Sequence, residues 1–157
     1  MGTIVESAQR EAGAGEAPEA LSRVAVAAAP ITHAALRIGA GLLFMQHGVQ
    51  KLFGWLGGFG GQPGNTAELF SLLGLAGVLE VFGGLLIVLG LFTRPVALVL
   101  AVEMVVAHFM VHQPQGGFPI QNGGELALLY ALVFASLFSS GAGKASLDGR
   151  LAARRGR

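Results

Sequence analysis

Ionisable side chains inside long apolar runs constrain this chain more than any other feature. The four runs cover about residues 34–56, 69–92, 95–112 and 124–140. Each is close to the ~20 apolar residues that a helix needs to cross a bilayer. A charged side chain at the bilayer centre costs about 2.5–3.5 kcal/mol on insertion scales. The pattern therefore predicts an all-α polytopic membrane protein, a bundle of four transmembrane helices whose ionisable residues face a polar pocket inside it.

The composition of the chain agrees with a membrane protein and excludes some chemistry. Hydrophobic residues make up 53% of the chain and charged residues 12%, whereas a soluble domain carries about 25% charged residues. The chain has no cysteine, which excludes thiol–disulfide exchange, iron–sulfur clusters and thiolate zinc sites on it. Electrons in any redox reaction would then sit on a quinone, a haem, a metal or a partner protein. We expect the lipid bilayer as a partner, and no nucleic acid.

Three segments are expected along the chain. Residues 1–33 form a cytoplasmic N-terminal tail, predicted to be largely disordered because its first part has glutamates among Ala and Gly and no apolar core. A turn is expected at Pro30, before the first helix. Residues 34–140 form the four-helix membrane domain. Residues 141–157 form a basic cytoplasmic tail, and Gly141 ends the fourth helix.

The distribution of basic residues predicts the orientation of the chain. With four spans, both termini and the turn between the second and third spans share one side of the membrane. The opposite loops, about residues 57–68 and 113–123, contain no Lys or Arg. The other side holds all the loop and tail cations, with Arg37 at the start of the first span: Arg10, Arg23, Arg37, Arg94, Lys144, Arg150, Arg154, Arg155 and Arg157. The positive-inside rule therefore places both termini in the cytoplasm.

Helical geometry predicts which ionisable residues share a depth and a face. At about 1.5 Å per residue, His47, Glu80 and Glu103 lie near the midplane, and Lys51 lies about one turn nearer the outside. His47 and Lys51 are four residues apart and share a helix face. We expect Glu80 to point toward the first helix, with His47 as its nearer partner by depth and Lys51 able to reach down to it.

Glu103 and the histidines of the third run cannot all serve one small site on a regular helix. Glu103 and His112 are nine residues apart, which at about 100° per residue places them on opposite faces. One of them is therefore expected to face another groove or a neighbouring subunit, so a homo-oligomer stays open. His108 and His112 share a face and are weak candidates for a metal site, because two histidines alone do not define one. A polar mouth without metal is favoured for them.

Several strings in the chain resemble the DoxX family of small bacterial membrane proteins. They are LRIGAGLLFMQHGVQKLFG, LEVFGGLLIVLGLFTRP, NGGELALLYAL and GAGKASLD, in an order that covers about residues 34–149. The resemblance implies a four-helix protein of the bacterial inner membrane. Some relatives are subunits of a thiosulfate:quinone oxidoreductase, and others are associated with membrane oxidoreductase complexes that handle oxidative and thiol stress. If this chain is an enzyme, the resemblance implies an oxidoreductase component.

The leading hypothesis is a membrane subunit of a redox or oxidative-stress system that binds a quinone. Lys51 and protonated His47 would donate hydrogen bonds to a quinone carbonyl, Glu80 would relay protons, and Glu125 at the mouth completes the cofactor-binding set. One alternative is a non-catalytic scaffold that recruits soluble redox enzymes. Another is a metal-handling protein that uses His47 with the two histidines of the third run. A fourth interpretation, which needs no ligand, is a buried ion-pair network that only positions the helices.

Overall fold

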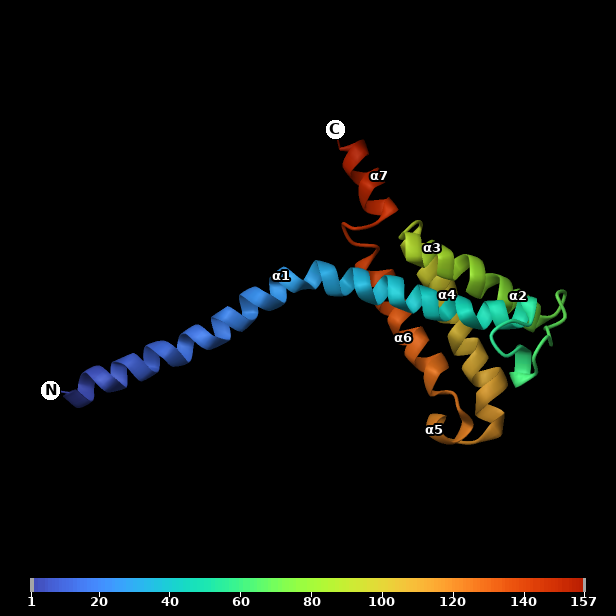
Figure 1. Ribbon diagram of the computed structural model, residues 1–157, viewed down its shortest axis with the longest axis horizontal. Coiled ribbons are helices and arrows are strands. Elements are labelled where there is room, and N and C mark those ends of the chain that lie inside the picture. The colour runs from blue at the N-terminus through green and yellow to red at the C-terminus, as the bar shows by residue number, and fades with distance from the viewer. Residues whose placement is uncertain (1, 157) are drawn as a thin grey trace. The chain divides into compact units, whose positions relative to one another are not determined.

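The computed structural model describes the backbone of residues 2–156 and the side chains of residues 19–156. All regular secondary structure in that part of the chain is helical, which confirms the all-α prediction. The chain divides into two compact units, one of residues 1–33 and the other of residues 34–157. Helix α1 (Gly2–Phe53) supplies the first unit and continues into the second (Figure 1).

The first unit is helical where the sequence predicted a largely disordered tail. The turn expected at Pro30 is not present, because α1 runs through this residue without a break. The local composition gives a reason, since seven of the ten residues before Pro30 are Ala or Val, and Ala is the strongest helix former. The Thr32 hydroxyl donates to the Ala28 and Ala29 carbonyls at 3.3 and 3.1 Å, beside the proline. The boundary and the cytoplasmic placement of this segment remain predictions.

Four apolar helical stretches form the second unit. After α1, a continuous helix is built from α2 (Leu72–Val78), a π-helical stretch η2 (Leu79–Gly83) and α3 (Gly84–Leu89). The next consists of α4 (Thr93–Ala107), the π-helical η3 (His108–His112) and a 3₁₀ turn. Three of the helices among the described residues are long and apolar enough to cross a membrane, and α6 (Glu125–Ser140) is a shorter apolar helix.

Glycines bring two of these helices into close contact. A Cβ atom at Gly48 would lie 2.7 Å from the Gly77 carbonyl oxygen, and one at Gly41 would lie 2.9 Å from the Gly84 carbonyl oxygen. Small residues allow helix backbones to approach in this way in membrane bundles. A Cβ atom at Gly39, by contrast, would meet nothing within 4 Å. The contact between the two helices therefore runs through Gly41 and Gly48 of α1.

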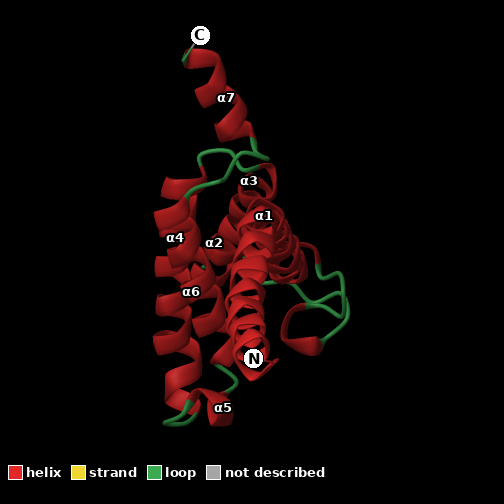
Figure 2. Cartoon of the chain, turned by 90° about the vertical axis from the view of Figure 1, so that its left-hand side faces the viewer, coloured by secondary structure: helices red, strands yellow, loops and turns green. Residues whose placement is uncertain are grey.

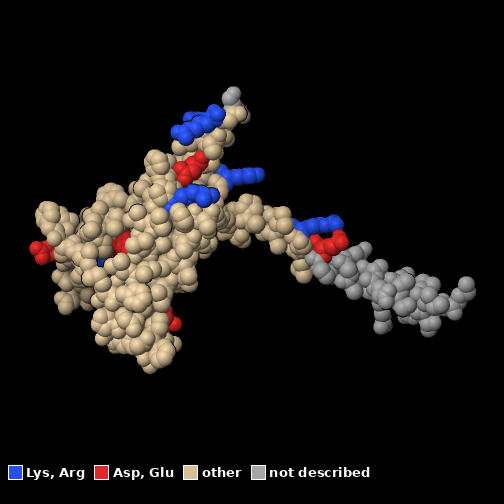
Figure 3. Space-filling model, turned by 180° about the vertical axis from the view of Figure 1, so that it is seen from behind, with Lys and Arg blue, Asp and Glu red and all other residues tan. Residues whose placement is uncertain are grey.

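The other two helices, α4 and α6, lie side by side and cross the first pair (Figures 1 and 2). Their packing surrounds an apolar core in which Phe44 of α1 meets Phe134 of α6, with ring centroids 4.8 Å apart. Large apolar side chains such as Phe70, Phe82 and Phe109 are more than half exposed. Such an apolar exterior, almost free of charge over the helices in Figure 3, suits contact with lipid.

A buried cation and an anion join three segments at one end of the second unit. The Arg37 guanidinium is 1% exposed and donates to the carbonyls of Ile87, Val88 and Ala145 at 2.5–2.7 Å. These carbonyls belong to the end of α3 and to the loop after α6. The Asp148 carboxylate, at the start of α7 (Leu147–Arg155), accepts from two backbone N–H groups at the start of α4, each at 2.9 Å. The start of the first span, the α3–α4 turn and the end of α6 therefore share one side.

Candidate functional site

A buried ion pair joins α1 to the π-helical stretch η2. Lys51 Nζ donates to Glu80 Oε1 and Oε2 at 2.5 and 2.6 Å, and the two side chains are 16% and 3% exposed. The prediction that Glu80 points toward the first helix is confirmed. Its partner is Lys51 rather than His47, because the four-carbon stem of the lysine lets the ammonium reach down one turn.

The ion pair forms one wall of a cavity of about 120 Å³ among α1, η2, α4, η3 and α6. The polar part of the wall also includes His47, His112 and Tyr130, whose ring meets that of His47 edge to face at 6.0 Å. The remaining wall is apolar and comes from Phe44, Met104, Ala107, Leu126 and Ala127. We call this space the polar cavity. It combines a few converging polar groups with apolar walls, as small-molecule sites commonly do.

Both π-helical stretches contribute a polar side chain to the polar cavity. Glu80 lies in η2 and His112 in η3. A π-helical turn contains an extra residue, so it rotates the following side chains relative to a regular helix. Such turns occur frequently at functional sites. The predicted partition of the third helix is confirmed, because His112 faces the polar cavity while Glu103 lines a different groove between α2 and α4.

The two histidines of η3 are held at the end of α4. Their rings stack with centroids 6.3 Å apart, and His112 Nδ1 lies 3.1 Å from the Asn122 carbonyl oxygen. His108 is 4% exposed and fits against Gly124, where a Cβ atom would lie 2.5 Å from its Nδ1. Among the side chains of residues 19–156, no three His, Asp or Glu residues form a group that could hold a metal ion. The geometry of the described residues therefore gives the metal alternative no support.

Glu125 does not line the polar cavity. It is exposed at the first turn of α6 and lines a separate surface groove with Pro119, Leu128 and Leu132. The structure thus brings together three of the four residues expected to bind a cofactor, namely His47, Lys51 and Glu80, and separates the fourth. Glu125 is separated because it lies on a different face of α6 from Ala127 and Tyr130, which face the polar cavity.

Two arrangements of polar side chains were not predicted from the sequence. The first is Tyr130, which faces the polar cavity. Its position could have been suspected from the sequence, because it is the only tyrosine of the chain and lies inside an apolar run. The Arg37 and Asp148 contacts at the other end were also missed. The place of Arg37, just after the start of an apolar run, could have indicated a buried cation. Its partners could not be predicted, because they are backbone carbonyls, which no pattern of side chains reveals.

Comparison with known proteins agrees with this architecture. A sequence model of the DoxX family matches residues 32–113. An uncharacterized protein of Haemophilus influenzae is 44% identical over 124 residues, which are 77% of this chain and 91% of that protein. An uncharacterized membrane protein of Mycobacterium tuberculosis is 35% identical over 156 residues, with 89% and 93% of the two chains covered. No solved structure matches the chain.

Proposed function

Because the chain belongs to the DoxX family and is a membrane protein, we propose that it is a membrane subunit of a redox system and that its polar cavity binds a quinone head group. The observation that carries the proposal is the Lys51–Glu80 pair, buried beside an unfilled space that other polar side chains also face. A pair that served only to join two helices would not need such a space. Intramembrane ionisable residues generally mark functional sites, since they are costly to insert.

The residues around the polar cavity fit a quinone head group. A carbonyl oxygen needs a hydrogen-bond donor, and the Lys51 ammonium has three N–H donors, of which Glu80 engages two. The His47 ring can donate a second hydrogen bond, while Phe44 and Met104 supply apolar surface for the ring. The volume of about 120 Å³ is well below the ~300–1,000 Å³ of complete ligand sites. Only the head group enters, so the apolar tail lies against the helices in lipid.

Lys51, Glu80 and His47 each have a role in this proposal. A quinone supplies two-electron chemistry when bound, and its reduction to a quinol takes up two electrons and two protons. The electrons come from a partner oxidoreductase, since a chain without cysteine carries no thiol or thiolate-bound cluster. Lys51 orients a carbonyl and stabilises negative charge that develops on its oxygen. Glu80 fixes the ammonium in place and, with His47, passes protons to the site.

Binding of a short-chain benzoquinone tests the proposal directly. Purified protein in lipid nanodiscs should show saturable binding and a rise in unfolding temperature with the quinone, and native lipid extracts should contain quinone. Lys51→Met should weaken binding about tenfold or more, as expected for the loss of one strong hydrogen bond. Arg150→Met, on the exposed face of α7, is the matched control and should bind normally. Absence of both bound quinone and a thermal shift would refute the proposal.

The scaffold alternative predicts a different result in cells. In a triple variant with His47, Lys51 and Glu80 replaced by alanine, stress resistance and capture of soluble redox partners should fall if the polar cavity is active. If both survive in stably inserted protein, the chain recruits enzymes and performs no chemistry at the cavity. Metal analysis of the purified protein separates the remaining alternative, in which His47 acts with His108 and His112.

We further propose that the protein lies in the bacterial inner membrane with both termini in the cytoplasm. The contacts of Arg37 and Asp148 support a shared side for the start of the first span, the α3–α4 turn and the end of α6. The basic residues gather toward this end, around α7 (Figure 3). A reporter enzyme that is active only in the periplasm should stay inactive when fused after Arg157. Strong activity would reverse the orientation.

A further inference from the structure

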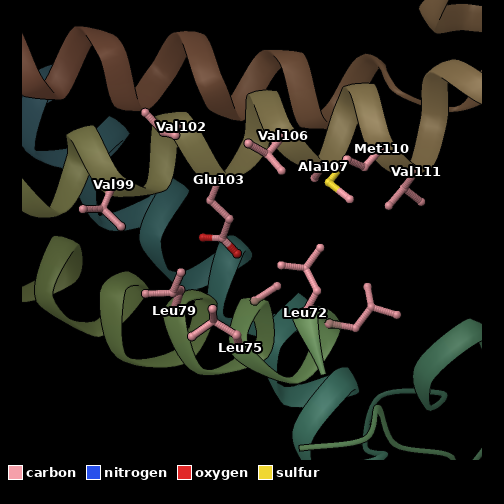
Figure 4. A pocket seen from close by; sticks show the side chains of 12 residues that line it. Leu72, Leu75, Leu79, Val99, Val102, Glu103, Val106, Ala107, Met110 and Val111 are labelled. Carbon is pink, nitrogen blue, oxygen red and sulfur yellow. The ribbon is translucent and has the colours of Figure 1, made fainter. Parts of the chain in front are cut away.

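An apolar groove lies between α2 and α4, apart from the polar cavity (Figure 4). Its volume is about 250 Å³, roughly twice that of the polar cavity. Apart from Glu103 its lining is entirely apolar: Leu72, Leu73, Leu75, Ala76, Leu79, Val99, Val102, Val106, Ala107, Met110 and Val111. Leu75, Val102 and Met110 are more than half exposed, so the groove opens on the apolar exterior of the bundle. We call it the α2–α4 groove.

One carboxyl group points into this groove without a partner. Figure 4 shows the Glu103 side chain extending from α4 toward Leu75 and Leu79 of the facing helix. Both carboxyl oxygens are buried, and neither has a hydrogen-bond partner among the described residues. A buried polar group without a partner costs about 1–3 kcal/mol, and more if it is charged. A carboxyl group without a partner in an apolar groove points to a ligand that supplies the missing polar partner.

The apolar spans have no Lys or Arg to spare for Glu103. The positive charge of Lys51 is paired with Glu80, whose two carboxylate oxygens lie 2.5 and 2.6 Å from Lys51 Nζ. Within residues 34–53, 72–89, 95–112 and 125–140, the only Lys and Arg residues are Lys51 and Arg37. Arg37, fourteen residues before Lys51 on α1, is bound to three backbone carbonyls. A second copy of this chain could therefore not present a free cation to the groove from its spans.

We propose that the α2–α4 groove binds a lipophilic cation from the bilayer, an amphiphilic ammonium compound for which Glu103 is the counter-ion. The apolar side chains would contact the hydrocarbon part, and the carboxylate would pair with the positive head group. A neutral lipid chain would fill the same groove but would leave the carboxyl oxygens without a partner. The site is separate from the proposed quinone site, because the body of α4 stands between them and only Ala107 lines both.

Octyltrimethylammonium is a suitable probe, because its neutral isostere, with a quaternary carbon in place of nitrogen, has the same shape. Equilibrium binding of the labelled cation should be measured on wild-type protein in phosphatidylcholine nanodiscs, with subtraction of the uptake by empty nanodiscs. We expect saturable binding of about one cation per chain, which excess isostere does not displace. Ionic attraction in a low-dielectric groove is the reason for this preference.

Three variants locate the site. Glu103→Gln keeps the size of the side chain and should weaken binding about tenfold or more, whereas Glu68→Gln, the same change on an exposed loop, should have no effect. Val106→Phe, on the open side of the groove, should also reduce binding while Glu103 remains. Thermal unfolding verifies that each variant is folded. Unchanged binding in Glu103→Gln, displacement by the isostere, or no saturable binding to the wild type would overturn the proposal.

Discussion

The part of α1 in the second unit, residues 34–53, buries a cation near each of its ends, and the two cations are held in different ways. Arg37 donates to backbone carbonyls at the end of α3 and in the loop after α6. Lys51 is paired with a carboxylate and borders the polar cavity. The Arg37 guanidinium satisfies backbone carbonyls at the end of α3, where the partial negative charge of a helix C-terminus attracts a cation. The Lys51–Glu80 pair leaves one N–H donor of the ammonium unused, and this ammonium borders the polar cavity.

The difference separates charge that holds the fold from charge that is available for a ligand. At the Arg37 end, every hydrogen-bond partner of the guanidinium is a backbone carbonyl, at the end of α3 or in the loop after α6, so the contacts specify how three segments meet. At the Lys51 end, the partner is another side chain, and an ion pair between two side chains can be replaced by apolar residues without leaving the backbone unsatisfied. Stability and binding should therefore respond differently to mutation at the two ends.

The largest effect is expected at the Arg37 end. Arg37→Met should lower the free energy of unfolding by about 5 kcal/mol, because the guanidinium makes three hydrogen bonds to backbone carbonyls, and a hydrogen bond to a charged group contributes about 1.5–3 kcal/mol. Thermal unfolding in mild detergent measures this loss, and Arg150→Met provides an exposed control that should change little. An Arg37→Met protein as stable as the wild type would mean that water satisfies these carbonyls.

Breaking the Lys51–Glu80 pair on one side should cost about 3–5 kcal/mol, because the remaining charge is buried alone. In a double-mutant cycle, Lys51→Ala should lose part of its effect when Glu80 is already Gln. His47→Ala should show weaker coupling, since His47 lies beside the pair without being its partner. Additive effects of Lys51→Ala and Glu80→Gln would show that the two residues do not interact.

A smaller effect is expected where α1 touches the neighbouring helix. Gly48→Ala places a methyl group 2.7 Å from the Gly77 carbonyl oxygen and should cost about 1–3 kcal/mol through overpacking. Gly39→Ala introduces the same methyl group where nothing lies within 4 Å, so it should be neutral or slightly stabilising. Equal unfolding temperatures for the two variants would argue against close packing at Gly48.

The smallest effect concerns the anion at the Arg37 end. Asp148→Asn should cost about 1 kcal/mol, because the amide keeps one acceptor for the N–H groups at the start of α4 but loses the favourable charge at a helix N-terminus. High salt should narrow the difference in unfolding temperature between this variant and the wild type. A salt-independent difference would assign the loss to hydrogen bonding alone.

Much of the fold followed from the sequence because depth and face are simple functions of residue number. The apolar runs located the helices. The rotation of about 100° per residue along a helix placed Glu103 and His112 on different faces. The π-helical stretches were not predictable in this way, since they depend on how neighbouring helices pack. The choice of Lys51 over His47 as the partner of Glu80 depended on side-chain reach. The contacts of Arg37 were missed because their acceptors are backbone atoms, which every residue carries.

The central claim is that the Lys51–Glu80 pair serves binding rather than stability. The most direct test replaces both residues at once, as Lys51→Met with Glu80→Met, and measures the unfolding temperature and benzoquinone affinity of the same preparation. Replacing a buried ion pair with apolar residues is often neutral or stabilising by about 1–4 kcal/mol. We predict a protein that is at least as stable as the wild type and binds the quinone at least about tenfold more weakly. Unchanged quinone affinity, or a protein that no longer folds, would contradict the claim.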